Sequence, residues 1–78
     1  MYLVKEIENS WESLDNNIAI FEDFPTIKQI RNIFYNKMNE FEYLKLINGE
    51  KVRHSRGGKE YFLNVQKIKF NKRYEIWG

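Results

Sequence analysis

Hydrophobic positions in the first nine residues alternate between two faces, which predicts a β-strand. In YLVKEIEN, residues 2–9, Leu3 and Ile7 share one face while Tyr2 and Val4 share the other. A strand with two apolar faces is expected to be covered on one side and partly shielded on the other.

A second apolar run, NIAIF, follows the Asn-rich stretch SWESLDNN, whose composition predicts a loop. Residues 17–22 form either a second strand that pairs with the first or an extended entry into a helix. The pattern favours the strand.

From Thr26 to Met38 the apolar positions take up a helical period. Pro25 is tolerated only in a first turn, and Thr26 with Gln29 matches a capping box, with Asp23 as a rival N-cap. The residues that fall on one stripe are Ile27, Ile30, Ile33, Phe34 and Met38. This stripe is expected to be core, because a small sheet needs a covering helix.

Strand-like runs separated by turn dipeptides dominate the rest of the chain. Asn-Gly and Gly-Gly supply the positive φ angles that tight hairpin turns need. We therefore predict three antiparallel strands, EYLKLI (42–47), KVRHS (51–55) and EYFLNVQKIKF (60–70), joined at Asn48-Gly49 and Gly57-Gly58.

The apolar parity of the last run changes along its length. Tyr61, Leu63 and Val65 alternate regularly, but Ile68 and Phe70 have the other parity. A slip of one residue would move core side chains into solvent, so a bulge or bend is expected near Gln66. Beyond it, residues 71–73 resemble a turn, and residues 74–77 resemble a short closing strand or an anchored tail.

These elements predict a single α+β domain spanning residues 1–78. Its antiparallel sheet of three to five strands would be covered on one face by a single α-helix, in the order β-(β)-α-β-β-β. The chain has no cysteine, so its thirteen aromatic residues are expected to supply much of the buried area.

Neither a membrane span nor a signal peptide is expected. No apolar run approaches the roughly 18 residues that a span requires, and Lys5 and Glu6 interrupt the N-terminal apolar run. We expect a soluble protein in the cytoplasm.

Charge is unevenly distributed along the chain. The first forty residues carry four basic and seven acidic side chains, and the remainder carry nine basic and four acidic ones. This asymmetry suggests a molecule with two signs of surface charge and a basic sheet edge.

Basic residues concentrate at the second turn and along the last strand. Such residues, interleaved with aromatic ones, suit binding to a phosphate backbone, and lysines on strand edges equally protect against aggregation. The candidate nucleic-acid contacts are Arg53, Arg56, Lys67, Lys69, Lys72 and Arg73.

No catalytic, cofactor or metal motif is present in the sequence. His54 is the only histidine, and no carboxylate spacing resembles a metal loop. A ribonuclease could use His54 beside Arg53 and Arg56, but no second proton-transfer group is evident. We expect His54 to be a partly exposed strand residue and the protein to be no enzyme.

The order of signals resembles the small βαββ anti-CRISPR proteins of phages that act on type I-F surveillance complexes. The shared signals are YLVKEIEN, a polar loop, a capped helix, a strand ending in ING, and a hairpin whose far strand begins GGKEY, over roughly residues 2 to 65. The longer Asn-rich loop, the extra aromatics and the basic tail from Lys67 to Gly78 depart from that pattern.

This resemblance implies a non-enzymatic phage or mobile-element protein that evades host defence by direct binding. It would bind a Cas effector complex, block the surface used by target DNA, and contribute basic side chains that can also touch DNA. Arg31, Lys37 and Lys59 match basic positions of the family, and with Arg53 and Arg56 they form the predicted partner-binding set. The alternatives are a small basic nucleic-acid-binding module and, third, a ribonuclease toxin.

Overall fold

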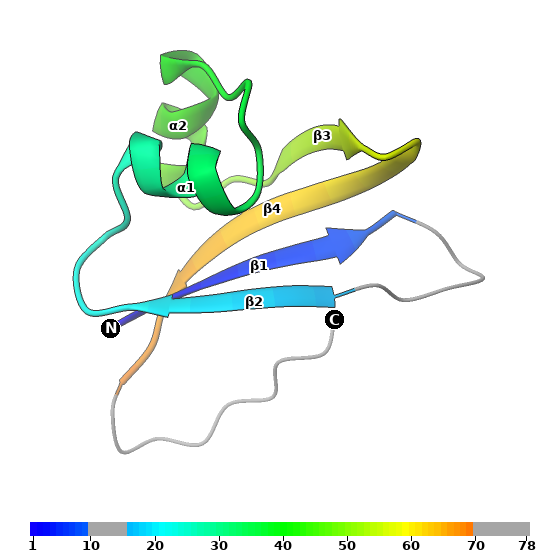
Figure 1. Ribbon diagram of the computed structural model, residues 1–78. Coiled ribbons are helices and arrows are strands. Elements are labelled where there is room, and N and C mark those ends of the chain that lie inside the picture. The colour runs from blue at the N-terminus through cyan, green and yellow to red at the C-terminus, as the bar shows by residue number, and fades with distance from the viewer. Residues whose placement is uncertain (10–15, 70–78) are drawn as a thin grey trace.

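The computed structural model describes residues 1–9 and 16–69 (Figure 1). Its elements are β1 (Tyr2–Glu8), β2 (Asn16–Phe21), α1 (Ile27–Ile33), α2 (Glu40–Ile47), β3 (Val52–Arg56) and β4 (Lys59–Lys67). The four strands form one antiparallel sheet in the order β2-β1-β4-β3, and both helices lie on the same side of it. The predicted α+β class is confirmed, but the order is β-β-α-α-β-β and two helices, not one, cover the sheet. No helix in the described ranges is long and apolar enough to cross a membrane.

The first two predicted strands are present and pair with each other. Val4 lies opposite Ala19 of β2 on one side and opposite Val65 of β4 on the other, so β1 is a central strand. Its parity is as predicted: Val4 contributes to the core beneath the helices, and Leu3 is buried on the opposite face. The predicted strand at residues 17–22 is therefore present as β2, which spans Asn16–Phe21 and ends one residue before Glu22.

α1 begins where the sequence predicted and ends earlier. The Thr26 side chain accepts a hydrogen bond from the Gln29 backbone, and the Gln29 side chain accepts one from the Thr26 backbone, which completes the capping box. The helix ends at Ile33 rather than extending to Met38. Met38 is still buried, because the Arg31 Nε donates to the Met38 carbonyl at 2.7 Å and holds the connecting segment against the core.

The predicted strand at residues 42–47 is wrong, because this segment is the helix α2. Asn39 and Glu42 form a second capping box. The acidic side chains of the first turn, Glu40 and Glu42, interact favourably with the helix dipole and stabilise the N-terminus of the helix. At the other end the Glu50 N–H bonds the Lys45 carbonyl and the Gly49 N–H bonds the Leu46 carbonyl, as in a Schellman motif. Asn48-Gly49 thus ends a helix instead of joining two strands.

The hairpin predicted at Gly57-Gly58 is confirmed. Both glycines have positive φ, 60° and 80°, and they join Arg56 to its cross-strand partner Lys59. The bulge predicted near Gln66 is absent, because the pairing of β1 with β4 runs without interruption to Lys67, where the strand ends. The turn and strand predicted at residues 71–77 lie outside the described residues.

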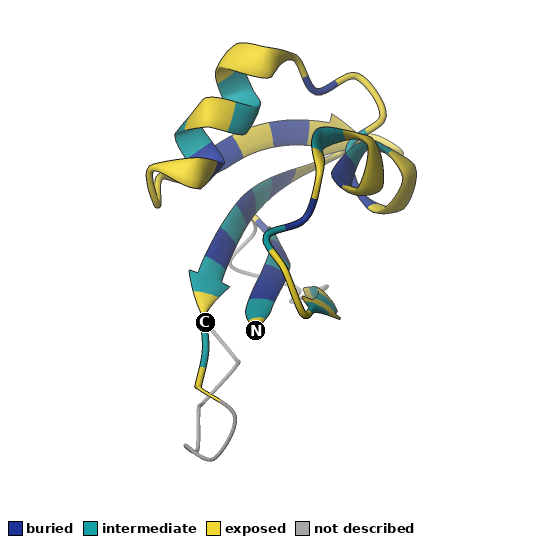
Figure 2. Cartoon of the chain, turned by 90° about the vertical axis from the view of Figure 1, so that its left-hand side faces the viewer, coloured by how far each residue is buried: buried dark blue, intermediate teal, exposed yellow. Residues whose placement is uncertain are grey.

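The core lies between the helices and the face of the sheet that they cover. Figure 2 shows buried residues alternating with more exposed ones along the strands. Aromatic rings extend this core towards one end, where Phe24 packs edge-on against Tyr2 and Tyr43 at centroid distances of 5.3 and 6.0 Å. The residues of the main cluster are Val4, Ile30, Phe34, Met38, Leu46, Val52, Leu63 and Val65.

Candidate functional site

The three basic residues around the β3–β4 turn each face a carboxylate. Arg53 pairs with Glu60 at 2.6 Å, Arg56 pairs with a second carboxylate at 2.6 Å, and the Lys59 Nζ lies 3.7 Å from Glu8. Because β-strand side chains alternate between faces, Arg53 lies on the face away from the helices while Arg56 lies on the helix side. The predicted cluster is thus divided between two faces and largely charge-compensated.

Glu6 is the carboxylate that Arg56 binds, and it is completely buried on the helix side of β1. Its Oε1 accepts hydrogen bonds from Arg56 at 2.6 Å and from the Asn17 amide at 2.9 Å. Its Oε2 lies 2.7 Å from the His54 Nε2. A buried carboxylate needs such partners, because an uncompensated charge in a protein interior is strongly unfavourable.

His54 is a buried member of this cluster, which corrects the prediction of a partly exposed residue. Its side chain is 1% exposed, and its ring lies between Tyr35 and Tyr61 at centroid distances of 4.7 and 5.6 Å, stacked on both. Burial lowers the pKa of the imidazole, the Arg56 charge adds to this effect, and the nearby Glu6 carboxylate opposes it. An imidazole so enclosed is poorly placed to exchange protons with a substrate.

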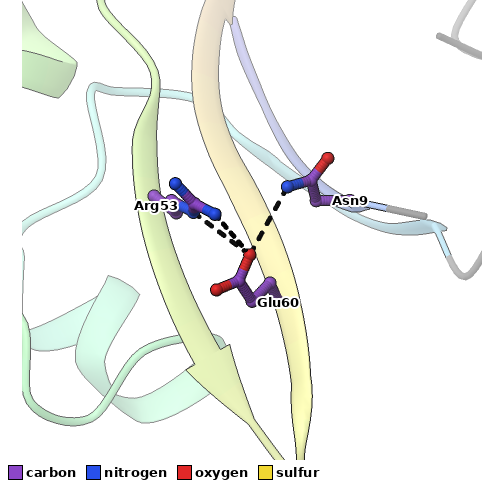
Figure 3. Close-up of polar contacts among 3 residues, drawn as sticks. All are labelled: Asn9, Arg53 and Glu60. Carbon is purple, nitrogen blue, oxygen red and sulfur yellow. Dashed lines mark hydrogen bonds and ion pairs between the residues drawn. The ribbon is translucent and has the colours of Figure 1, made fainter.

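A second cluster lies on the opposite face of the sheet, where it joins β3 to β4. Figure 3 shows Glu60 of β4 between Arg53 and Asn9. Two nitrogens of Arg53 donate to Glu60 Oε2, at 3.2 and 2.6 Å, and the Asn9 amide reaches the same oxygen at 3.5 Å. Arg53 lowers the pKa of the Glu60 carboxyl through a hydrogen bond and its charge.

The remaining predicted nucleic-acid contacts do not join this turn. Lys67 ends β4, eight residues from Lys59, so a distance of roughly 27 Å separates the two ends at the usual rise per residue. Lys69 lies just beyond, and Lys72 and Arg73 lie outside the described residues. Among the described residues, the predicted basic surface therefore consists of two separate groups.

Arg31 and Arg56 line a common cleft of about 250 Å³ between the end of α1 and β3. Lys37 is exposed in the segment that leads from this cleft to α2. The structure thus brings together two members of the predicted partner-binding set, Arg31 and Arg56. Arg53 and Lys59 lie at the hairpin with different carboxylate partners.

α2 carries a surface that the sequence prediction missed. Phe41, Leu44 and Ile47 are 68, 54 and 49% exposed, and their spacing of three residues places them along one side of the helix. We call these three residues the α2 stripe. Lys45 lies over the Phe41 ring at 5.5 Å. The predicted strand at residues 42–47 placed Leu44 and Ile47 on opposite faces and did not include Phe41, which concealed the stripe.

Glu6 was also missed as a site residue, although a signal for it exists. It has the parity of Tyr2 and Val4, so the same alternation that predicted the covered face places a carboxylate on it. Its partners could not be read in the same way, because Arg56 is 50 residues away in the chain.

Comparison with known proteins adds no assignment to this geometry. No protein-family model, curated protein or solved structure matches the chain.

Proposed function

We propose that this chain is a non-enzymatic binding protein that inhibits a host defence nuclease complex, such as a CRISPR–Cas surveillance complex, by direct contact. The observation that carries the binding role is the α2 stripe. Three large apolar side chains on one side of an eight-residue helix expose area that water solvates poorly, and such patches mark protein–protein contacts. An exposed aromatic residue such as Phe41 is a typical anchor for an interface.

The identity of the partner rests on the sequence resemblance to phage anti-CRISPR proteins. The opening strand, the capped helix and the GGKEY hairpin remain parts of that resemblance. The strand ending in ING does not, because residues 42–47 are helical. The proposal therefore moves the main contact from the hairpin to the helical layer, with Lys37 next to it as a basic neighbour.

The geometry favours this role over the two alternatives. The turn cations already face carboxylates, which reduces the counterion release that drives binding to a nucleic-acid backbone. The enclosed His54 likewise offers little to a ribonuclease mechanism, in which a proton must reach the substrate.

A pull-down and an interference assay against purified Cas complexes test the proposal. We expect the chain to co-purify with a complex and to reduce its target cleavage. Leu44→Ser should weaken both effects, whereas Ile20→Thr, which alters a 60% exposed residue of β2 outside the helical layer, should leave them unchanged. If the chain binds none of the complexes, the proposed partner is wrong. If the two variants behave alike, the α2 stripe is not the contact surface.

A further inference from the structure

The cleft between α1 and β3 has the composition of a site for a small anion. The polar side chains that line it on the helix side of the sheet come from the end of α1, the following turn and β3: Arg31, Asn32, Asn36, His54 and Arg56. The Tyr35 ring also lines the cleft, but its hydroxyl donates to Glu42 Oε2 at 3.2 Å. None of the residues that line it in the described structure is acidic. The Arg31 and Arg56 side chains are therefore the charged groups that a ligand in this cleft meets first.

Both guanidinium groups are held in place while part of each stays available. Arg31 is fixed by its Nε, which donates to the Met38 carbonyl, and its two terminal nitrogens make no hydrogen bond or ion pair within the described residues. Arg56 is fixed through one nitrogen by Glu6 and lies over the Tyr61 ring at 5.2 Å. A side chain that is already ordered loses less conformational entropy when it binds a ligand.

The buried Glu6 sets the charge of this site. It compensates one of the two arginines, so the cleft has a modest positive charge supplied mainly by Arg31. Planar guanidinium groups match the oxygen geometry of phosphate and carboxylate, and two of them beside amide donors suit a tetrahedral anion. The volume of about 250 Å³ exceeds several-fold the roughly 30 Å³ share of one water molecule, which leaves room for an organic group on the anion.

We propose that this cleft binds the phosphate group of a small phosphate monoester, with Arg31 and Arg56 contacting its oxygens and the Asn36 amide beside them. This site is separate from the α2 stripe and does not depend on the proposed inhibitory function. The α2 stripe can fail as a protein contact while the cleft still binds phosphate, and the reverse is also possible.

Calorimetric titration with inorganic phosphate, phenyl phosphate and acetate tests the site. We expect saturable binding at one site per chain for the two phosphates and none for acetate. Arg31→Gln should weaken binding about 10-fold to 100-fold, because hydrogen bonds to charged groups contribute that much. Arg31→Lys should recover only part of this loss, because a lysine lacks the guanidinium fork.

Asn36→Asp tests the same site without altering the Arg31–Met38 contact, in case the Arg31 variants disturb the fold. It changes an exposed residue and places a negative charge in the cleft, so we expect phosphate binding to fall by about tenfold or more. Asn16→Asp makes the same change at an exposed position of β2 and should bind like the unaltered chain. Equal weakening by both variants would overturn the proposal, because it would indicate a general charge effect.

Two other results would also overturn it. Equal binding of phosphate and acetate, without sensitivity to Asn36→Asp, would indicate nonspecific ion association. Binding of a single-stranded oligonucleotide without binding of phenyl phosphate would assign the arginines to a nucleic-acid backbone. Partner pull-down should be unaffected by Asn36→Asp, which keeps this test separate from that of the α2 stripe.

Discussion

Two carboxylates of the sheet bind arginines of β3 at the same distance and in opposite surroundings. Glu6 receives Arg56 at 2.6 Å on the helix side, where the carboxylate side chain is 0% exposed. Glu60 receives Arg53 at 2.6 Å on the other face, where its side chain is 47% exposed. The bond lengths do not distinguish these pairs. Burial does.

The difference shows why contact distance alone is a poor guide to energetic importance. An exposed carboxylate that loses its arginine is solvated by water, so the pair contributes little. A buried carboxylate that loses its arginine keeps its desolvation cost and has few other partners. Glu6 also has an amide and an imidazole as neighbours, while among the described residues the Glu60 side chain has a long contact to Asn9 besides its arginine.

The largest expected effect on stability comes from removing Arg56, with removal of Arg53 as the comparison. Arg56→Gln should lower the free energy of unfolding by about 3–5 kcal/mol, because it leaves the buried Glu6 without its cation. Arg53→Gln is the matched control, and its urea midpoint should shift little. Urea unfolding followed by circular dichroism measures both, and similar losses in the two variants would show that burial is not what separates the clusters.

A smaller effect is expected at the amide partners. Asn17→Ala removes a 2.9 Å hydrogen bond to the buried carboxylate and should cost about 1.5–3 kcal/mol, the range for bonds to charged groups. Asn9→Ala removes a 3.5 Å contact to an exposed carboxylate and should leave stability almost unchanged. The same urea titrations compare the two variants, and a larger loss for Asn9→Ala would reverse the ranking.

The buried cluster should also make stability depend on pH. Since burial lowers the pKa of His54 below its ordinary value of 6.5, the unfolded chain takes up a proton at a pH where the folded chain does not. The contribution of the neutral, buried His54 to the free energy of unfolding is therefore expected to be fully present above pH 6.5 and to fall as the pH decreases below it. The groups that face this imidazole are Glu6, Arg56, Tyr35 and Tyr61.

Urea midpoints at about pH 7.5 and about pH 5.5 measure this dependence, which His54→Gln should reduce. NMR titration of the single imidazole gives an independent reading. A midpoint at or above pH 6.5 for His54 in the folded protein would contradict the expectation.

The smallest effect is expected at the exposed cluster. Arg53 lowers the pKa of Glu60 from its ordinary value of 4.5, so the contribution of this pair is present above pH 4.5 and is lost as the pH falls further. Arg53→Gln should raise the pKa of Glu60 back towards 4.5, as NMR of the side-chain carboxyl would detect. An unchanged pKa would mean that the ion pair does not persist in solution.

The two turn dipeptides show how far local signals predict this fold. Gly57-Gly58 has positive φ at both residues and forms the predicted hairpin, whereas only Gly49 of Asn48-Gly49 has positive φ. Asn48 has a φ of −81° and caps α2. A glycine with positive φ serves a hairpin and a helix C-terminus equally well, so the dipeptide alone does not distinguish them.

The candidate surfaces were less accessible to sequence reasoning than the fold. The basic residues were recognised by type, but their carboxylate partners come from other strands and change their role. Recognising the α2 stripe from the sequence requires assigning residues 40–47 to a helix. The apolar positions of these eight residues fit both a helical and a strand period. Tyr43 and Leu46 face the sheet at helical spacing, while Leu44 and Leu46 match a strand just as well.

The amino-acid sequence by itself determined the α+β class, the Thr26 capping box, the parity of β1 and the β3–β4 hairpin. Each of these depends on neighbours within a few residues, where steric limits and hydrogen bonding act directly. Only the tertiary structure decided that residues 40–47 are helical and that Glu6, His54 and Arg56 form one buried cluster. The cluster depends on strands β1 and β3 lying on either side of β4, and no local pattern encodes that arrangement.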